Sequence, residues 1–342
     1  MESRDHDETE AREPEPETRD QEPEGESERE RSSAEVTHEP EPERASEEDD
    51  YEGAKLRGAK AREDYARSMV PPGGSADDEY RWHTGTNRAT GVPDAVEFVE
   101  VHKSFGRNKI LRGLNMGIPE GKISMILGPS GTGKSVCIKH MVGLLYPDDG
   151  DVLVHGESVP NMPDNELFEM RKKFGVLFQD GALFGSMNLF DNVCFPLRQH
   201  TDKGEDEIED IVMRRLREVG LEGALDKMPN ELSGGMRKRA GFARALVLDP
   251  DIVLFDEPDS GLDPVRTALL CELIQEIHEE NGGAYVVITH DIMSAKRVAE
   301  HISVLWKGRI VESGPAQELF NSDNMFVRQF LSGASRGPLG ME

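Results

Sequence analysis

The stretch ISMILGPSGTGKSVCIKHM, residues 123–141, decides the fold of this chain. Its first five residues are apolar and have the length of a buried strand, and a glycine-rich turn, GPSGTGKS (128–135), follows directly. The residues from Lys134 to about position 144 read as a helix. The turn fits the pattern G-x-x-x-x-G-K-S/T in the strand–turn–helix setting that gives this pattern its meaning. The stretch therefore predicts a phosphate-binding loop at the edge of a sheet.

The chemistry of the turn suits a nucleotide. Glycines let backbone N–H groups converge on phosphate oxygens, and the start of the following helix adds partial positive charge. Lys134 can reach the β- and γ-phosphates, and the hydroxyl of Ser135 can ligate Mg²⁺. We expect the phosphate contacts to come from Gly128, Ser130, Gly131, Gly133, Lys134 and Ser135.

Outward from the turn, the apolar pattern predicts an α/β domain. Four more compact apolar strands follow at residues 176–178, 252–255, 286–288 and 302–306, with helical stretches between them. Such spacing is typical of a parallel sheet covered on both faces. The residues from 95 alternate instead, which predicts antiparallel strands. A mainly helical region spans about 188–248, and its residues 205–219 carry apolar side chains at helical spacing.

Two further motifs carry chemistry. In IVLFDEP (252–258) two carboxylates follow a buried strand, so Asp256 can hold the Mg²⁺ shell and Glu257 can act as general base. By itself, an acidic pair after a strand is common. In LSGGM (232–236) Ser233, Gly234 and Gly235 open a helix, either as an ordinary cap or as a second anion site. One nucleotide does not need two phosphate sites in one chain, so the second site predicts a dimer.

The order of these motifs resembles the ABC ATPase family over about residues 95–314. The resemblance implies a P-loop ATPase with a RecA-like core, an antiparallel β subdomain, a helical subdomain, and the cofactors ATP and Mg²⁺. It also implies roles for four more residues. Phe105 would stack on adenine, Gln179 would touch Mg²⁺ and sense the permease, Asp263 would lie in the D-loop, and His290 would contact the γ-phosphate. The family signature usually ends in Gln where Met236 stands; Ser233 and Gly235 are kept, so we expect activity.

A narrower resemblance concerns residues 177–201 (LFQDGALFGSMNLFDNVCFPLRQHT) and 232–246 (LSGGMRKRAGFARAL). Both segments are similar to the ATPases of the Mla and Mce lipid-transport systems, and most of all to the Mce-associated ATPases of mycobacteria. The resemblance implies a homodimer under two YrbE-type integral membrane permeases, which carry Mce proteins. It places the subunit on the cytoplasmic face of the inner (plasma) membrane.

Charge divides the chain unevenly. The net charge is −27, and residues 1–50 hold 22 Asp plus Glu against 6 Arg, which gives −16 and leaves −11 for the rest. Since these residues are almost free of apolar side chains, we predict a disordered acidic tail over 1–68 and a Pro/Gly-rich linker over 69–93. The tail either solubilises the chain or regulates it, and Met69 is an alternative start. The negative charge of the tail would repel the phosphates of a nucleic acid, which argues against a nucleic-acid partner.

The remaining features restrict compartment and architecture. Cys137, Cys194 and Cys271 lie far apart, which fits a reducing cytosol without disulfide or zinc frameworks. There is no secretory signal, and no apolar run approaches the ~18 residues that would span a bilayer. Other chains would have to cross the membrane.

A C-terminal extension over 315–342 reads as two short helices, 316–320 and 325–331. They pack either on their own ATPase body, 94–314, or on a neighbouring subunit.

A soluble ABC ATPase is the competing class. DNA-repair types insert coiled coils between the phosphate loop and the signature, whereas Lys134 and Ser233 are only 99 positions apart (233 − 134). Translation types carry two ATPase domains, and this chain carries one. An iron–sulfur assembly ATPase stays open. An apolar series after Gln179 favours permease docking, with core packing as its alternative; it comprises Leu183, Phe184, Met187, Leu189 and Phe190.

Overall fold

A computed structural model describes residues 93–338, so the predicted tail and nearly all of the predicted linker lie outside the described residues. The larger sheet has six strands in the order β10-β9-β3-β8-β7-β6. Neighbouring strands are parallel except for the β9–β10 pair, which is antiparallel. The strands are β3 (Ile123–Leu127), β6 (Phe174–Leu177), β7 (Ile252–Asp256), β8 (Ala284–Thr289), β9 (His301–Trp306) and β10 (Arg309–Pro315).

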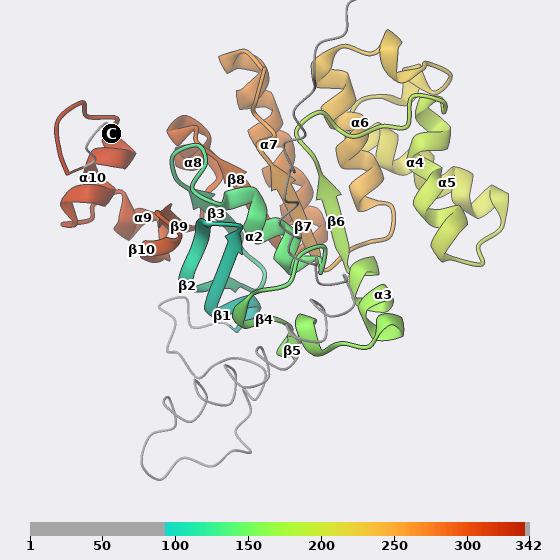
Figure 1. Cartoon of the computed structure of the whole chain (residues 1–342). Coiled ribbons are helices and arrows are strands. Elements are labelled where there is room, and N and C mark those ends of the chain that lie inside the picture. Colours follow the sequence, from blue (N-terminus) through green and yellow to red (C-terminus); the bar gives the residue numbers. More distant parts are fainter. Residues whose placement is uncertain (1–92, 339–342) are drawn as a thin grey trace, which may run out of the picture. The chain divides into compact units, whose positions relative to one another are not determined.

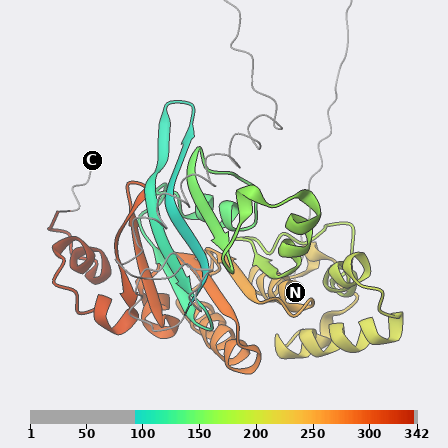
Figure 2. The same ribbon diagram turned by 90° about the horizontal axis from the view of Figure 1, so that it is seen from below.

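A second sheet of four antiparallel strands has the order β2-β1-β4-β5. Its members are β1 (Asp94–Phe105), β2 (Asn108–Pro119), β4 (Asp149–Val154) and β5 (Glu157–Ser158). The antiparallel pattern predicted from residue 95 is confirmed. Strand β4 escaped prediction, because it opens with Asp149, Gly150 and Asp151, residue types that strands disfavour. Figure 2 shows the teal β1–β2 hairpin between the red C-terminal strands and the green elements that follow it.

The helices surround the six-stranded sheet, and α4, α5 and α6 form a separate group at one side of Figure 1. Their bounds are α2 (Lys134–Met141), α3 (Asp164–Lys172), α4 (Leu189–His200), α5 (Glu205–Glu218), α6 (Gly234–Leu246), α7 (Pro264–Asn281) and α8 (Ile292–Val298). Helix α2 ends before the predicted position, because Gly143 adopts a left-handed conformation with φ of 66°. Helix α5 buries Ile208, Val212 and Leu216, as its spacing predicted.

Two hydrophobic cores lie on the two faces of the six-stranded sheet. Alternation along β7 separates them: Ile252 and Leu254 enter one core, and Val253 and Phe255 enter the other. The first core joins the sheet to α2, α3 and the antiparallel sheet, and the second joins it to α4, α5, α6, α7 and α8. Because side chains pack on both faces, a strand such as β7 is an unbroken apolar run. The two cores hold the sheet rigidly, and the loops at the ends of its strands are therefore fixed in position.

The C-terminal helices α9 (Ala316–Leu319) and α10 (Met325–Ser332) pack on their own chain (Figure 1). Val327 and Leu331 of α10 are buried in the second core, and the rings of Trp306 and Phe326 have centroids 5.2 Å apart. Among the helices within residues 93–338, none has the length and apolar character to cross a bilayer.

Candidate functional site

The phosphate loop connects β3 to α2 and is shaped by close backbone packing. A methyl group added at Gly128 would lie 2.3 Å from the carbonyl oxygen of Leu305, so no larger residue fits there. Gly133, at the start of α2, has φ of 104° and would place a methyl group 2.9 Å from Ile110 Cγ2. Only glycine adopts that backbone conformation without strain. The loop is therefore fixed between β9 on one side and β2 on the other.

Lys134 lies at the centre of the loop. Its ammonium group donates hydrogen bonds to the carbonyl oxygens of Gly128 at 2.9 Å and Pro129 at 3.0 Å. The residue is only 5% exposed, and burial lowers the pKa of its side chain, while the charges of Glu257 and Asp256 act in the opposite direction. A buried cation that is paired mainly with neutral carbonyls has unused attraction for an anion. The loop thus offers a phosphate group a dehydrated positive charge.

Ser135 and Asp256 form the part of the site that suits a divalent cation. The Ser135 hydroxyl donates to Asp256 Oδ1 at 2.9 Å. Burial raises the pKa of Asp256, and the hydrogen bond from Ser135 opposes this shift. Two adjacent hard oxygen ligands fit Mg²⁺, which keeps several waters and takes few protein ligands. Among residues 93–338, no cluster of three or more His, Cys, Asp or Glu could hold a metal ion by itself.

Glu257 follows Asp256 and sits in a strained backbone conformation. Its φ is 48°, which is rare for a residue with a side chain, and its N–H donates to the Ile288 carbonyl at 2.9 Å. The carboxylate lies 3.9 Å from Lys134 Nζ and 3.7 Å from His290 Nδ1. Strain of this kind costs about 1–3 kcal/mol and collects at functional sites. The turn after β7 therefore holds this carboxylate in the space between the lysine and the histidine.

His290 follows β8 and is half-exposed, and its neighbours fix the backbone at its position. The Thr289 hydroxyl donates to Asp259 Oδ2 at 2.8 Å and accepts from the Asp291 N–H at 2.9 Å. Asp291 in turn caps α8 through Met293 N–H and Ser294 N–H. Burial raises the pKa of Asp259. Adjacent strands thus bring together five of the predicted residues, namely Lys134, Ser135, Asp256, Glu257 and His290.

Three predicted residues have other contacts. Phe105, at the end of β1, is 47% exposed, and the Lys103 ammonium lies over its ring, 5.8 Å from the ring centroid. The amide of Gln179 donates to the hydroxyl of Ser260 at 2.8 Å. Asp263 caps α7 by accepting from Val265 N–H and Arg266 N–H, both at 3.0 Å, and the bond from Arg266 N–H is the main cause of its lowered pKa.

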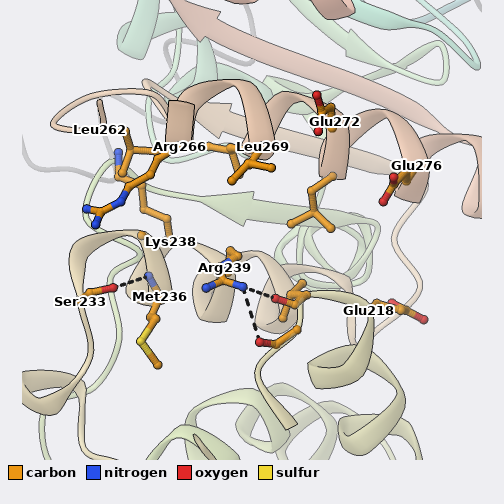
Figure 3. A pocket seen from close by; sticks show the side chains of 15 residues that line it. Glu218, Ser233, Met236, Lys238, Arg239, Leu262, Arg266, Leu269, Glu272 and Glu276 are labelled. Carbon is orange, nitrogen blue, oxygen red and sulfur yellow. Dashed lines mark hydrogen bonds between the residues drawn. The ribbon is translucent and has the colours of Figure 1, made fainter. Parts of the chain in front are cut away.

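The signature residues open α6 beside a groove of about 610 Å³ that α7 borders (Figure 3). Ser233 caps the helix, and its hydroxyl accepts from Met236 N–H at 3.3 Å. Among the described residues, the nearest atom to a methyl group added at Gly234 would be Arg237 Nη2 at 3.9 Å, and at Gly235 it would be Leu262 Cδ2 at 4.0 Å. Glycine within a helix costs about 1 kcal/mol relative to alanine. Since packing within the chain does not require these glycines, they leave space for a group from outside.

Two cations of α6 that the sequence did not single out join the signature to the rest of the site. The buried Lys238 donates to the Pro258 carbonyl at 2.6 Å and to that of Ser260. Arg244 donates to the carbonyls of Ala182 at 2.8 Å and Gly181 at 3.0 Å. Burial lowers the pKa of both side chains. In the sequence they belong to a basic helical face of the kind that usually lies in solvent, so only the fold reveals their contacts.

Known proteins resemble this chain in sequence. A family model described as ABC transporter matches residues 111–260. The Mycobacterium leprae protein named "Probable ribonucleotide transport ATP-binding protein mkl" is 53% identical over 247 residues, which cover 72% of this chain and 71% of that protein. The Escherichia coli K12 protein named "Intermembrane phospholipid transport system ATP-binding protein MlaF" is 42% identical over 248 residues, which cover 72% of this chain and 92% of that protein.

Solved structures share the fold. The cbiO1 protein of Clostridium perfringens, part of the ABC transporter complex cbiONQ, matches with a TM-score of 0.62 and 29% identity, covering 70% of this chain and 95% of that chain. The dimeric ATP-binding cassette MJ0796 bound to ADP and Pi matches with a TM-score of 0.60 and 31% identity, covering 65% of this chain and 99% of that chain. The chain therefore belongs to the ABC transporter family, as an ATPase subunit of a transporter.

Proposed function

We propose that this chain hydrolyses ATP through the cluster of Lys134, Ser135, Asp256, Glu257 and His290, and the meeting of these five side chains carries the proposal. Lys134 binds the terminal phosphates, and Glu257 accepts the proton of the attacking water. His290 orients Glu257 and contacts the γ-phosphate. Ser135 and Asp256 would hold Mg²⁺, which would supply positive charge against the phosphate oxygens. Gln179 senses the permease next to the Mg²⁺ shell, and Phe105 stacks on adenine.

The site is completed by a second copy of the chain. Ser233, Gly234 and Gly235 of one copy contact the nucleotide held by the phosphate loop of the other, and Asp263 lies in the adjoining D-loop. The open space at the two glycines supports this arrangement. So does the similar MJ0796 cassette, which is a dimer in its ADP- and Pi-bound structure. A symmetric pair of chains then carries two composite sites.

The subunit energises a Mce-type lipid transporter by docking on two YrbE-type permeases at the cytoplasmic face of the inner membrane. Of the apolar series after Gln179, Leu189 is fully buried and Leu183 and Phe190 pack against the core. Phe184 differs: it is 43% exposed, and its ring lies 5.0 Å from Phe195. The docking role therefore falls on Phe184, with Met187 beside it.

The two relatives are named for different cargoes, a phospholipid and a ribonucleotide. We favour lipid because the phospholipid-system relative is matched over 92% of its length. The cargo test is direct. The full chain and its co-purified membrane partners, reconstituted in vesicles, should hydrolyse ATP faster when transferable phospholipid is present and should not respond to ribonucleotide monophosphates. The opposite response would overturn the lipid assignment.

Co-purification separates a transporter subunit from an iron–sulfur assembly ATPase. The tagged chain, recovered from detergent-solubilised membranes, should bring integral membrane permeases with it and show Mg²⁺-dependent ATPase activity. Phe184→Asp should lose the permeases and keep ATP binding. Phe168→Asp is the matched control, because Phe168 is similarly exposed, at 48%, but lies on α3. Recovery of soluble assembly proteins without permeases would contradict the proposal.

A further inference from the structure

A buried lysine of helix α6 binds the turn that follows the proposed general base. The turn comprises residues 258–260, directly after Glu257, and we call it the support turn. Lys238 Nζ donates to the carbonyl oxygen of Pro258 at 2.6 Å and to that of Ser260. Figure 3 shows Lys238 on the side of α6 that faces the start of α7. The contact therefore joins the signature helix to the turn after β7.

The backbone at Glu257 depends on its surroundings for support. Its φ of 48° is strained, and such a conformation persists only where neighbouring contacts hold it. On its amino side, the Glu257 N–H donates to the Ile288 carbonyl at 2.9 Å. On its carboxyl side, the Ser260 N–H donates to the Glu257 carbonyl at 3.1 Å, and the two bonds from Lys238 hold the rest of the turn. Lys238 is thus part of what keeps the strained residue in place.

The support turn also contacts the other residues of the site. Asp259 Oδ2 accepts from the Thr289 hydroxyl at 2.8 Å, and Thr289 directly precedes His290. The Ser260 hydroxyl accepts from the Gln179 amide at 2.8 Å. A displacement of the turn would therefore also disturb the contacts that position the histidine and the glutamine.

A cation is not needed to fill the position of Lys238. The side chain is 5% exposed, and among residues 93–338 no carboxylate lies within 4.0 Å of its ammonium group. Burial lowers its pKa, while the charges of Asp259, Asp180 and Glu257 act in the opposite direction. A methionine has a similar length and would fill the same space without the cost of burying a charge. What the lysine adds is therefore its pair of hydrogen bonds to the support turn.

The two arginines that flank Lys238 have different partners. Arg237 donates to the Leu232 carbonyl at 2.7 Å, and Arg239 donates to the Val219 carbonyl at 2.9 Å. Both acceptors lie in the segment between α5 and α6, away from the turn after β7 in the sequence. Of these three consecutive cations, Lys238 is the one that bonds the support turn within the described part of the chain. Arg239 therefore offers a matched control, with the same helix and the same kind of bond but another acceptor.

We propose that Lys238 is a positioning residue for ATP hydrolysis. Its bonds hold the support turn and thereby keep the Glu257 carboxylate of the same chain beside Lys134 and His290. The lysine does not touch the nucleotide in this role, so it acts on the rate of hydrolysis and not on the binding of ATP. The inference rests on the proposed role of Glu257, which Glu257→Gln tests by itself.

Steady-state kinetics and equilibrium binding test the role of Lys238. Lys238→Met should lower kcat by about thirty- to hundredfold, because misplacing a reacting group by about 1 Å can cost ~10² in rate. The affinity for a fluorescent ATP analogue should stay within about twofold of the parental value, since ground-state binding is untouched. Lys238→Arg can donate to both carbonyls and should restore most of the parental kcat. Arg239→Met should keep the parental kcat and affinity. An unchanged kcat in Lys238→Met, or an equal loss of affinity and turnover, would overturn the proposal.

Mixed dimers test whether Lys238 acts on Glu257 of its own chain. When Lys238→Met is mixed with Ser233→Arg, one composite site of each mixed dimer keeps every required residue, so up to about a quarter of the parental activity should return. When Lys238→Met is mixed with Glu257→Gln, each site lacks either the lysine or the carboxylate, and only the residual activity of Lys238→Met should remain. If the lysine acted on the signature of its own chain instead, the two outcomes would be exchanged, which would overturn the proposal.

The mixture of Lys134→Ala with Ser233→Arg is the reference, because it tests the composite site without changing Lys238. Recovery in the reference together with recovery in both Lys238→Met mixtures, or in neither, would also contradict the inference. A reference that stays inactive would instead refute the composite site of the proposed function. The comparison of kcat with ATP affinity in Lys238→Met then decides the positioning role, since it does not depend on the mixtures.

Discussion

At the scale of single residues, the active cluster depends on the unusual position of Glu257. Its left-handed φ of 48° turns the chain directly after β7 and brings the carboxylate to 3.7 Å from His290 and 3.9 Å from Lys134. Asp256, one position earlier, contacts Ser135 instead. Two adjacent carboxylates thus have different partners, because the backbone turn separates them.

Glu257→Gln should reduce the turnover of ATP by about 10²–10⁴, because the amide cannot accept the proton of the attacking water. The affinity for ATP should stay close to that of the parent, since the phosphate loop is untouched. Turnover is measured by phosphate release and affinity by equilibrium binding of a fluorescent ATP analogue. Glu279→Gln, at an exposed position of α7, is the control and should change neither value. A variant that turned over at the parental rate would remove Glu257 from the mechanism.

At the scale of secondary-structure elements, a buried guanidinium attaches helix α5 to the body of the protein. Arg215 is 1% exposed and bonds Glu218 at 2.7 Å within its helix, Asn281 at 3.4 Å at the end of α7, and Asp249 before β7. Arg214 lies next to it and approaches two of the same carboxylates, yet its side chain is 51% exposed. A comparison of Arg214 with Arg215 therefore distinguishes the effect of burial on stability from the effect of charge.

Arg215→Ala should lower the free energy of unfolding by about 2–5 kcal/mol, because it leaves a cavity where the fully buried side chain packs and removes its bonds to Glu218, Asp249 and Asn281. Arg214→Ala, the matched control, should change it by no more than about 0.5 kcal/mol, as exposed ion pairs contribute little. Urea denaturation followed by circular dichroism gives both values. Equal effects of the two substitutions would show that burial of Arg215 is not what stabilises α5.

Helix α2 contains a histidine that should make the protein sensitive to acid. His140 is buried, and its Nδ1 lies 2.7 Å from the Val136 carbonyl oxygen. Burial lowers its pKa from 6.5 to about 4. Between these two values the unfolded chain binds a proton that the folded chain does not. Acid therefore destabilises the fold in that window, by about 3 kcal/mol at its lower end, and the contribution of His140 is intact above pH 6.5.

His140→Gln should remove this part of the pH dependence. Between pH 7 and pH 4.5 the free energy of unfolding of the parent should fall by about 2–3 kcal/mol more than that of the variant. The comparison uses the slope with pH, so a constant destabilisation of the variant does not affect it. Urea denaturation at several pH values provides the measurement. Parallel curves for the two proteins would mean that His140 titrates normally in the folded state.

At the scale of the whole molecule, the proposed composite site requires two copies of the chain. Mixing two inactive variants therefore tests it. Lys134→Ala and Ser233→Arg each damage both composite sites of a symmetric dimer. A mixed dimer has one doubly damaged site and one intact site. After random mixing at equal concentration, half of the dimers are mixed, so we expect up to about a quarter of the parental activity from two inactive proteins.

The control mixes Lys134→Ala with the doubly substituted chain that carries Lys134→Ala and Ser233→Arg. No intact site can form in that mixture, so it should stay inactive. Phosphate release is measured at a total concentration where light scattering shows dimers in the presence of ATP. Failure of the first mixture to regain activity would refute the composite site.

The sequence by itself determined the fold and the core of the site. The phosphate loop, the acidic pair after β7 and the histidine after β8 each follow a buried apolar strand, and parallel strands align their carboxyl ends at one edge. Local spacing therefore predicted that Lys134, Asp256 and Glu257 would meet, whereas the role of His290 was implied by the resemblance to the ABC ATPase family. The positions of β3, β6, β7, β8 and β9 followed from the same apolar pattern, whereas β4, β5, β10, α3, α7 and α8 were not located individually; at β4, glycine and aspartates hide the pattern.

Only the tertiary structure decided how the site is supported and what surrounds it. Lys238 and Arg244 bind carbonyl groups from distant loops, and nothing in their local sequence distinguishes them from exposed cations. The β1–β2 hairpin and the turn between β9 and β10, which are far apart in the sequence, are likewise hydrogen-bonded together through Arg112, Gly308 and Arg309. Secondary structure follows from short-range periodicity, whereas these contacts depend on which loops the packed sheet brings together. The physical reason is that side-chain partners across long sequence separations are selected by burial and close packing of the backbone, which no local pattern records.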